Sequence, residues 1–474
     1  MPLARVFQLA AKVESSEGQE ETLTADDVVV VTEVSVDDST DFEENNTSGQ
    51  SLSGDFQTAG RTTRTMTFQQ ELRGNTTGAT DQDKSSAAPP WDRFLRPSGF
   101  EKVGLQRVTG SITSGPFMIG EILDGGSGGS AVVVTPSKGS EELFVIPLEG
   151  ALSGTLTGRD SGASISTPTI TDDYGTGYRF VSQKTARVEV DTWTSTPSIG
   201  DVFTVFASAT SKEQVATGQI LADRSVSDTF VDLEVLITSG GLAAGNVMRV
   251  GSRSAAVETV EALAGPSLTL LSNQDGKRRV NTGARGDFTL DVPPGDKGTF
   301  SFTFEGSGPP ATDEAPIPGA SADPLAAPRF QEAMLHMGYN RGDAGSPDHF
   351  FACLPLKSFQ LAISATVELH TNPCAPEGID GSNITDRDPT VTIEVDHVGV
   401  TGFDWGGALR NSTPIRFGFV FGTEVGNRVG IICPRCQVTS LSDGEAEGLL
   451  TDSVELKLRR ILEAGDDELF IVKF

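Results

Sequence analysis

Residues 286–306 read GDFTLDVPPGDKGTFSFTFEG, and residues 54–74 read GDFQTAGRTTRTMTFQQELRG. Both stretches begin with Gly-Asp-Phe, carry a second Phe twelve residues after the first, and reach a glycine six residues later. In the later stretch, apolar residues alternate with polar ones, which is typical of a half-buried strand. Each copy therefore predicts two strands joined by a turn. The anchor residues are Phe56, Phe68 and Gly74 in the first copy and Phe288, Phe300 and Gly306 in the second.

A short segment with helical spacing follows each of these glycines. Trp91 opens the first segment after two prolines, and Phe330 opens the second after Pro328. Gly99 and Gly338 follow them, where a helix would end. The repeat unit is thus predicted to be strand, turn, strand, loop and helix.

Two further matches extend the repeat. Residues 188–191 read VEVD and residues 393–396 read IEVD, and a Gly-Asn pair occurs at 245–246 and again at 426–427. We interpret the chain as two tandem copies of one mainly β domain, each a β-sandwich or barrel with a short flanking helix. The predicted domains span residues 1–280 and 281–474.

The first copy is longer than the second. Gly99 to Val188 covers 89 residues, whereas Gly338 to Ile393 covers 55, a difference of 34. Within the excess, Gly120, Ser127, Gly128 and Ser130 recur 34 residues later as Gly154, Ser161, Gly162 and Ser164. We therefore predict a Gly-rich β-hairpin insert at about 107–168, made by duplication and projecting from the first domain.

The composition restricts the possible partners. The 36 Lys and Arg are outnumbered by 65 Asp and Glu, which gives a formal charge of −29. Such a balance disfavours direct reading of nucleic acid, because affinity for phosphate comes from clustered cations. The longest apolar runs are far shorter than the ~20 residues that span a bilayer. Residues 1–12 lack a convincing signal peptide, so we expect synthesis in a cytoplasm and no membrane partner.

Motifs for chemistry are weak throughout. Cys433-Pro-Arg-Cys436 has the spacing of half a zinc site or of a redox pair, but nothing completes it, and buried reduced thiols are favoured. The Gly-rich run 125–129 lacks the Lys-Ser/Thr of a phosphate loop, and residues 380–386 lack the closing Glu of a calcium loop. His336 lies on the predicted second helix, where a structural role is favoured. We expect no catalytic residue, no metal and no cofactor.

Five short segments together resemble a known family. They are LAAKVESSEG at 9–18, TFQQELRG at 67–74, PPWDRFLRPSGFE at 89–101, NITDRDPTVTIEVD at 383–396 and GNRVGIICPRCQ at 426–437. In these patterns of strand and turn, the chain resembles the major tail tube proteins of long-tailed, siphovirus-like bacteriophages. The resemblance covers much of both predicted domains but not the insert.

The resemblance implies a structural virion protein that is not an enzyme. Family members form hexameric rings that stack into a tail tube, a passive conduit for DNA during ejection. Because this chain carries two such domains, the implied assembly is a ring of three chains, with six chains as the alternative. Implied partners are further copies of itself, the tape measure, terminator and distal tail proteins, and viral DNA only in passage. The implied location is the virion tail, after synthesis in the bacterial host cytoplasm.

Two other classes of function stay open from the residues alone. A virion decoration protein or host-binding adhesin would share the β-rich, Gly-rich and acidic composition. A carbohydrate-active enzyme would need two carboxylates placed in a cleft, which a sequence does not show.

Overall fold

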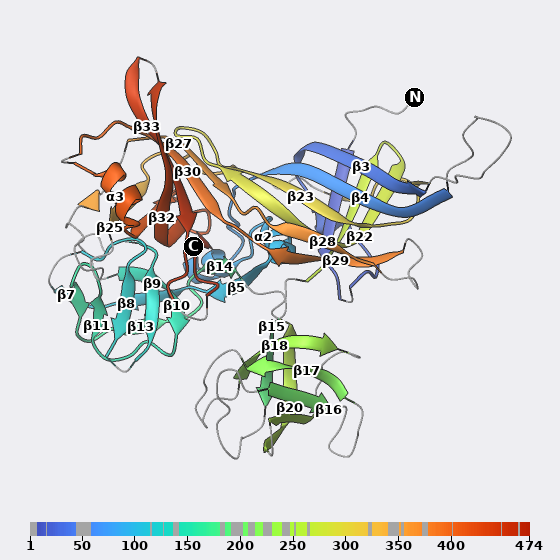
Figure 1. The fold of residues 1–474 in the computed structure, drawn as a ribbon, viewed down its shortest axis with the longest axis horizontal. Helices are drawn as coiled ribbons and strands as arrows, with labels where there is room; N and C mark the ends of the chain where they lie inside the picture. Colours follow the sequence, from blue (N-terminus) through green and yellow to red (C-terminus); the bar gives the residue numbers. More distant parts are fainter. Residues whose placement is uncertain are drawn as a thin grey trace. The chain divides into compact units, whose positions relative to one another are not determined.

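The computed structural model is mainly β, as the sequence predicts (Figure 1). It describes residues 7–15, 17–43, 58–113, 116–126, 128–135, 142–180, 185–190, 202–206, 214–220, 230–238, 247–250, 253–262, 266–320, 325–339, 350–351, 355–371, 378–400, 402–446, 448–462 and 465–474. The chain divides into two compact units. The first comprises Met1–Arg179, Ser267–Ile461 and Asp467–Phe474, and the second comprises Phe180–Pro266 with Leu462–Asp466.

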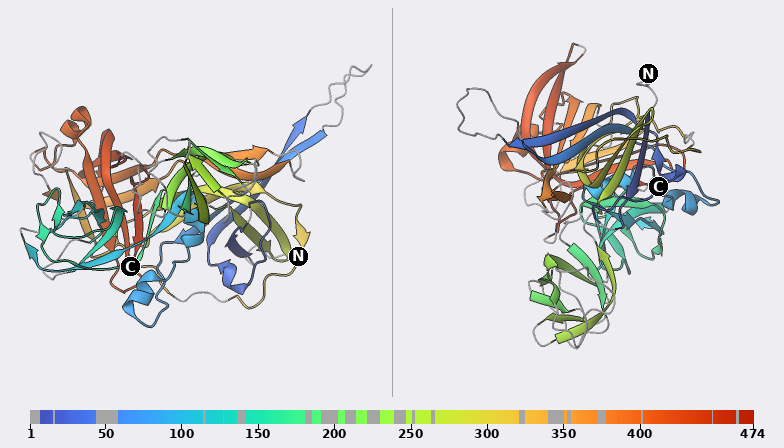
Figure 2. Two further views of the ribbon diagram at one scale, coloured as in Figure 1. Left: turned by 90° about the horizontal axis from the view of Figure 1, so that it is seen from below. Right: turned by 90° about the vertical axis from the view of Figure 1, so that its right-hand side faces the viewer.

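The first unit is built on one large, almost wholly antiparallel set of strands (Figures 1 and 2). Among the described residues its strands are β1 Phe7–Val13, β2 Val28–Val29, β3 Thr32–Glu43, β4 Thr58–Glu71, β5 Phe100–Gly104, β14 Thr176–Phe180, β21 Leu268–Gln274, β22 Lys277–Asp291, β23 Thr299–Ser307, β24 Thr312–Asp313, β25 Met334–Tyr339, β26 Phe350–Phe351, β27 Leu356–Ala362, β30 Thr390–Asp396, β31 Ile415–Phe421, β32 Val429–Ala446, β33 Leu449–Leu458 and β34 Phe470–Lys473. A separate hairpin pairs β28 Thr366–Thr371 with β29 Ile379–Asp386.

The two repeat copies lie side by side in this sheet. Strand β4 pairs with β23 so that Phe68 is opposite Phe302, while β3 flanks β4 and β22 flanks β23. The four strands thus form two hairpins joined along their inner strands. The boundary predicted at residue 280 lies inside β22, and the compact units divide the chain at other positions. Two tandem domains are therefore not confirmed.

The strand-turn-strand prediction holds for the second copy and is wrong for the first. In the second copy, Phe288 lies in β22 and Phe300 in β23, and the turn between them contains Pro293-Pro294 and Gly295 at φ +80°. In the first copy β4 runs without a turn from Thr58, because its Thr-rich sequence lacks a Pro-Pro pair and its one glycine, Gly60, does not adopt a positive φ. Phe56 lies outside the described residues.

Both anchor glycines lie close to the end of a strand, where neighbouring atoms leave no room for a side chain. A Cβ on Gly74 would lie 2.0 Å from the carbonyl oxygen of Gly426, and the Gly74 amide donates to Asn427 Oδ1 at 2.7 Å. A Cβ on Gly306 would lie 2.5 Å from Asn281 Oδ1. Glycine is therefore required at both positions for close approach.

The first predicted helix is present and the second is not. Helix α2 Asp92–Leu95 begins after Trp91, continues as the 3-10 turn Arg96–Ser98 and ends at Gly99, which has φ +86°. Residues 334–339, by contrast, form β25, which contains Gly338 and His336 and pairs along its length with β31. Tertiary pairing with the fully buried β31 outweighs local helical spacing here. Phe330 lies before this strand and packs on Phe419 and Phe421.

Three further short helices were not predicted. Helix α1 Asp81–Ser86 lies in the segment that the repeat unit assigns to a loop; its amino end is capped by Thr80 and its carboxyl end by a buried lysine. Lys473 donates to the carbonyl oxygens of Lys84, Ser85 and Ala87. The others are the 3-10 turn Ala25–Asp27 and helix α3 Trp405–Asn411.

Aromatic side chains from both copies form the core between α2 and the four-stranded region. Phe302 is 1% exposed, and its ring centroid lies 5.5 Å from Phe68 and 5.2 Å from Phe94. Phe288 and Phe300 complete this cluster, and Trp91 packs on Phe300 while its Nε1 donates to the Arg73 carbonyl at 2.8 Å. Four of the predicted repeat residues, Phe68, Trp91, Phe288 and Phe300, therefore meet in one core.

The predicted hairpin insert is a larger structure, which we call the docked module. Its strands are β6 Gln106–Thr109, β7 Ile112–Thr113, β8 Ile122–Gly125, β9 Ser130–Val133, β10 Glu142–Glu149, β11 Leu156–Gly158, β12 Ser164–Ile165 and β13 Thr169–Thr171. The 34-residue repeat corresponds to two paired hairpins, β8 with β9 and β11 with β12. A single projecting hairpin is wrong, because these strands pair with each other and enclose their own apolar core.

The docked module packs against the main sheet through a second apolar cluster. Val132 and Ile146 from the module contact a surface formed by Ile432, Phe470 and Val472. All five of these side chains are at most 2% exposed. The module is thus part of the first compact unit instead of projecting from it.

The second unit is a closed antiparallel barrel. Its strands are β15 Thr185–Val190, β16 Val202–Phe206, β17 Gln214–Ile220, β18 Phe230–Thr238, β19 Val247–Val250 and β20 Arg253–Ala262. The VEVD segment of the third sequence match begins in β15, whereas its IEVD counterpart lies in β30 of the first unit, so the two are not structurally equivalent. Of the fourth match, residues 245–246 lie outside the described residues.

Replacing Phe302 by Ala is expected to lower the free energy of unfolding by about 3–5 kcal/mol, because it opens a cavity between the two copies. Thermal or denaturant unfolding measures the change. Phe42→Ala is the matched control: its side chain is 60% exposed, and a change below about 0.5 kcal/mol is expected. Equal losses for both variants would contradict this account of the core.

Candidate assembly surface

The residues singled out for chemistry do not form a reactive site. Within the described part of the chain, no three His, Cys, Asp or Glu side chains gather as a metal site requires. Cys433 and Cys436 are buried free thiols on β32. Burial raises the pKa of the Cys436 thiol well above its usual value, which disfavours the reactive thiolate. Cys353, Cys374 and His349 lie outside the described residues.

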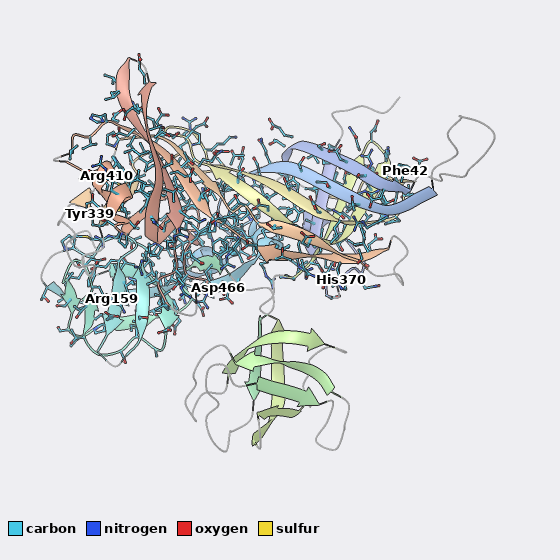
Figure 3. All side chains as sticks on the ribbon, viewed as in Figure 1. Phe42, Arg159, Tyr339, His370, Arg410 and Asp466 are labelled. Atoms are coloured by element: carbon cyan, nitrogen blue, oxygen red, sulfur yellow. The ribbon has the colours of Figure 1, made fainter. Side chains whose placement is uncertain are left out.

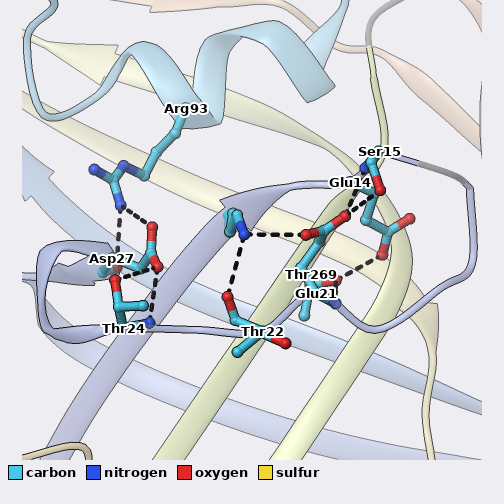
Figure 4. Close-up of polar contacts among 9 residues, drawn as sticks. Glu14, Ser15, Glu21, Thr22, Thr24, Asp27, Arg93 and Thr269 are labelled. Carbon is cyan, nitrogen blue, oxygen red and sulfur yellow. Dashed lines mark hydrogen bonds and ion pairs between the residues drawn. The ribbon is translucent and has the colours of Figure 1, made fainter.

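Buried carboxylates in the first unit serve the fold. Glu14, just after β1, accepts hydrogen bonds from Ser267 Oγ at 2.5 Å and the Gly283 amide at 2.8 Å. It also accepts one from Thr269 Oγ1 at 2.9 Å (Figure 4). It thereby joins the amino-terminal strand to β21 and β22. Nearby, hydrogen bonds from Ser15 lower the pKa of Glu21 to about 2. These groups already have partners, so they are unsuited to general acid–base work.

His336 links the docked module to the main sheet. Its Nδ1 accepts a hydrogen bond from the Ile119 amide at 3.1 Å, so the ring must be neutral at that nitrogen. Burial, aided by the charge of Arg416, lowers the pKa of His336 from 6.5 to about 4. Arg416 itself pairs with Asp160 of the module. The sequence expectation of a structural histidine agrees with this geometry, although the residue lies on a strand.

The first unit has an exposed edge strand. In the described residues β3 pairs along one side only, with β4, and its polar groups on the other side have no ladder partner. The strand is acidic, with Glu33, Asp37, Asp38, Asp41 and Glu43. Phe42 is 60% exposed at the far end of the β3–β4 hairpin (Figure 3), and Val30, just before β3, is 47% exposed. We call β3 with Val30 and Phe42 the edge surface.

A second exposed apolar group lies on the β32–β33 hairpin. Leu449 and Leu450 are 57% and 52% exposed at the turn, where Ala446 pairs with Leu449. The His397 amide donates to the Leu450 carbonyl at 3.0 Å, and Val400, 70% exposed, follows three residues later. We call Leu449, Leu450 and Val400 the tip surface. It lies at the other end of the unit from the β3–β4 hairpin (Figure 1).

Carboxylates surround the tip surface. Asp443 and Glu445 are exposed on β32, and Asp452 on β33 bonds His397 Nδ1 at 2.9 Å. That hydrogen bond and the negative charge of Asp452 raise the pKa of His397. The tip surface is therefore an exposed apolar patch with carboxylates around it. The negative charge of these carboxylates disfavours non-specific association, while the apolar side chains stay accessible to a specific partner.

The sequence did not reveal these two surfaces. Leu449-Leu450 reads like the start of any buried strand, and only solvent exposure distinguishes it. The adjacent Gly448 and the acidic residues around the pair were the available signal for a protruding turn.

Comparisons with known proteins do not assign a function. The chain matches no protein family model, and no curated protein matches it. No helix in the described residues is long and apolar enough to cross a membrane. The functional argument therefore rests on the fold and on the edge and tip surfaces.

Lowering the pH from 6.5 to 4 is expected to weaken folding through His336. The unfolded chain takes up this proton near pH 6.5 and the folded chain only near pH 4, so stability falls across that window, by up to about 3 kcal/mol. His336→Asn, which offers an oxygen acceptor to Ile119, should remove this part of the pH dependence. Denaturant unfolding at several pH values measures it.

His370→Asn is the matched control, because His370 is exposed on β28. The pH dependence of that variant should follow the wild type. If the His336 variant also keeps the full wild-type pH dependence, His336 is not the titrating group.

Proposed function

We propose that this chain is the repeating subunit of a bacteriophage tail tube, a structural virion protein whose rings stack into a passive conduit for DNA. The observation that carries the proposal is that the first unit has two exposed surfaces at different ends. One is the edge surface, which contains the open edge strand β3, and the other is the apolar tip surface. The resemblance of five sequence segments to major tail tube proteins supports the same reading.

The positions of the surfaces favour repeated head-to-tail contacts. The edge surface and the tip surface consist of different residues on different strands, so a contact between them joins unlike faces of two copies. Contacts of this kind generate rings when the rotation closes and continuous filaments when it does not. A tube of stacked rings uses both outcomes. Strand pairing at β3 would also satisfy the polar groups of that edge.

The charge supports a passive role. With a formal charge of −29, repeated copies would present a strongly negative surface to DNA. Like-charge repulsion would keep DNA from adhering as it passes. The proposal includes no catalytic step and no cofactor. The expected partners are other copies of the chain, the tape measure, terminator and distal tail proteins, and DNA only in passage.

The proposed ring contains three chains, since the main sheet carries two hairpins, β3–β4 and β22–β23, each holding one of the repeat stretches, and each hairpin would supply one of six similar positions. A ring of six chains is the alternative. Electron microscopy of concentrated protein tests the proposal. Hollow rings or tubes with three-fold symmetry, six-fold at low resolution, support it. Discrete solid particles that never stack would favour a decoration protein or a host-binding adhesin.

Charged substitutions on the tip surface should block assembly without unfolding the chain. In Leu449→Asp/Leu450→Asp, two exposed apolar side chains become carboxylates in an already acidic setting. We expect at least a tenfold rise in the concentration needed for ring formation, a cost of about 1.4 kcal/mol or more per contact. Sedimentation and electron microscopy measure assembly, and thermal unfolding checks the fold.

The matched control is Thr157→Asp, an exposed position on β11 of the docked module and remote from both surfaces. It should assemble as the wild type does. If the double tip variant forms rings at the wild-type concentration, the tip surface takes no part in assembly.

A further inference from the structure

The barrel of residues 185–262 has the same strand connectivity as the docked module. In the docked module, β6 pairs with β10 and β13, β9 lies between β10 and β8, and β11 lies between β8 and β12. In the barrel, β15 pairs with β18 and β20, β17 lies between β18 and β16, and β19 lies between β16 and β20. Six ladders correspond when β12 and β13 together take the place of β20.

The registers of these ladders agree as well. Val108 is opposite Leu143 in the docked module, and Val188 is opposite Val231 in the barrel. We compare residue numbers after adding a fixed offset to each strand of the docked module: 80 for β6 and β8, 87 for β9 and 88 for β10. Every residue pair of the β6–β10, β9–β10 and β8–β9 ladders then matches a residue pair of the barrel. Shifts of 92 for β11 and 90 for β12 and β13 match the other three ladders in the same way.

A β-bulge occurs at the same place in both. In the docked module the register shifts between Pro147 and Glu149, which leaves Leu148 unpaired opposite β9. In the barrel the register shifts at the equivalent point of the β17–β18 ladder, which leaves Leu236 unpaired. Leu148 shifted by 88 is Leu236. Bulges are specific features of a strand pair, so their coincidence is strong evidence of common origin.

A few identities persist in the sequence at the same shift of 80 residues. Arg107-Val108 corresponds to Arg187-Val188, and Ile119-Gly120-Glu121 corresponds to Ile199-Gly200-Asp201. Both modules also begin and end on neighbouring strands: β6 pairs with β13, and Ala186 pairs with Ala262. Each is therefore connected to the rest of the chain at one end, as an inserted module requires.

The two modules differ at the positions that dock the first one. Core residues of the docked module have apolar counterparts in the sequence of the barrel: Val108, Leu123, Val133 and Val145 correspond to Val188, Phe203, Ile220 and Leu233. The face that contacts the main sheet becomes polar at its centre on β9 and β10: Val132, Phe144 and Ile146 correspond to Gln219, Asp232 and Glu234. Three positions of this face keep apolar counterparts, since Ile119, Val134 and the bulge residue Leu148 correspond to Ile199, Leu221 and Leu236. Carboxylates at the positions of Phe144 and Ile146 would be costly to bury against a face such as Phe470 and Val472.

We propose that residues 185–262 are a second copy of the docked module, resurfaced to need no apolar partner, and that this copy is an accessory module dispensable for ring assembly. The part concerning assembly rests on the proposed tube function. The part concerning duplication and loss of docking stands without it.

Excision from the full chain tests the proposal. Residues 181–265 are replaced by a short Gly-Ser linker, and the matched control replaces residues 106–171 in the same way. In the control, the linker joins Leu105 to Asp172. These ends lie close together, because the amide of Tyr174, two residues after Asp172, donates to the Leu105 carbonyl at 2.9 Å. We expect the first variant to keep the melting temperature of the main sheet and the wild-type assembly. The control should melt earlier or aggregate, because it uncovers the docking surface.

Two exchange variants test the docking face without removing a module. Ile146→Glu gives the docked module the residue of the barrel and should lower the melting temperature of the main sheet. Glu234→Ile makes the reverse change and should leave that temperature unaltered. A comparable loss in both variants would overturn the resurfacing.

The possible results separate the two proposals. If the wild-type chain forms no rings, the tube function fails, and the melting temperatures of the excision variants still decide whether the main sheet depends on residues 181–265. If the wild type forms rings and the 181–265 variant is folded but does not, the accessory role is overturned. If excising 181–265 unfolds the main sheet, the module is integral and the whole inference fails.

Discussion

The ladder between β4 and β23 is the contact on which the rest of the first unit depends. It joins two hairpins that lie more than two hundred residues apart in sequence, and it places Phe68 beside Phe302 under the short helix α2. Stacked and tilted rings of this kind contribute area and specific geometry together. Once this ladder forms, β3 becomes an edge strand at one side and β22 carries the sheet onward to β27. The exposed edge is thus a direct consequence of how the repeats pair.

Electrostatics act differently on the surface and in the interior. The exposed edge and tip are rich in carboxylates, which keep separate copies apart until apolar contact and strand pairing outweigh repulsion. Inside, single charges have several defined partners. Arg64 donates to the Val280 carbonyl and pairs with Asp38, and Glu14 receives several donors. Buried charges that are fully bonded favour one register over its neighbours.

Local patterns in the sequence predicted what local physics controls. The alternation at Phe300, Phe302 and Phe304 identified β23, because a strand with one buried face repeats every two residues. The proline start and glycine stop identified α2. The segment after Phe330 was wrongly predicted to be a helix. Its backbone pairs with β31, and the spacing of its apolar residues does not indicate a strand partner so distant in sequence. The docked module was underestimated for a related reason, because its sheet pairs strands that are distant in sequence, such as β6 with β13.

Surface exposure was equally hidden from the sequence. Leu449 and Leu450 are residue types that usually occur in a buried strand, so nothing in the sequence indicated their exposure. The likeness of the two modules was hidden as well, because they share few identical residues. It became visible only in the register of their ladders and in the position of the β-bulge. Of the exposed groups that form the candidate surface, the sequence identified only the acidic character of the chain.

The amino-terminal strand has a consequence for how the chain folds during synthesis. Leu9 pairs with Ser272, and Glu14 bonds Thr269 across 255 residues of sequence. Strand β2 offers β1 only two nearby residue pairs, so β1 gains its long ladder only after β21 has been synthesised, more than 250 residues later. The ladders of the docked module and of the barrel involve only their own residues, so both can form before β21 has been synthesised. Strand β1, although it is translated early, thus completes its pairing only in the second half of synthesis, and its apolar residues stay without their main ladder until β21 has been made.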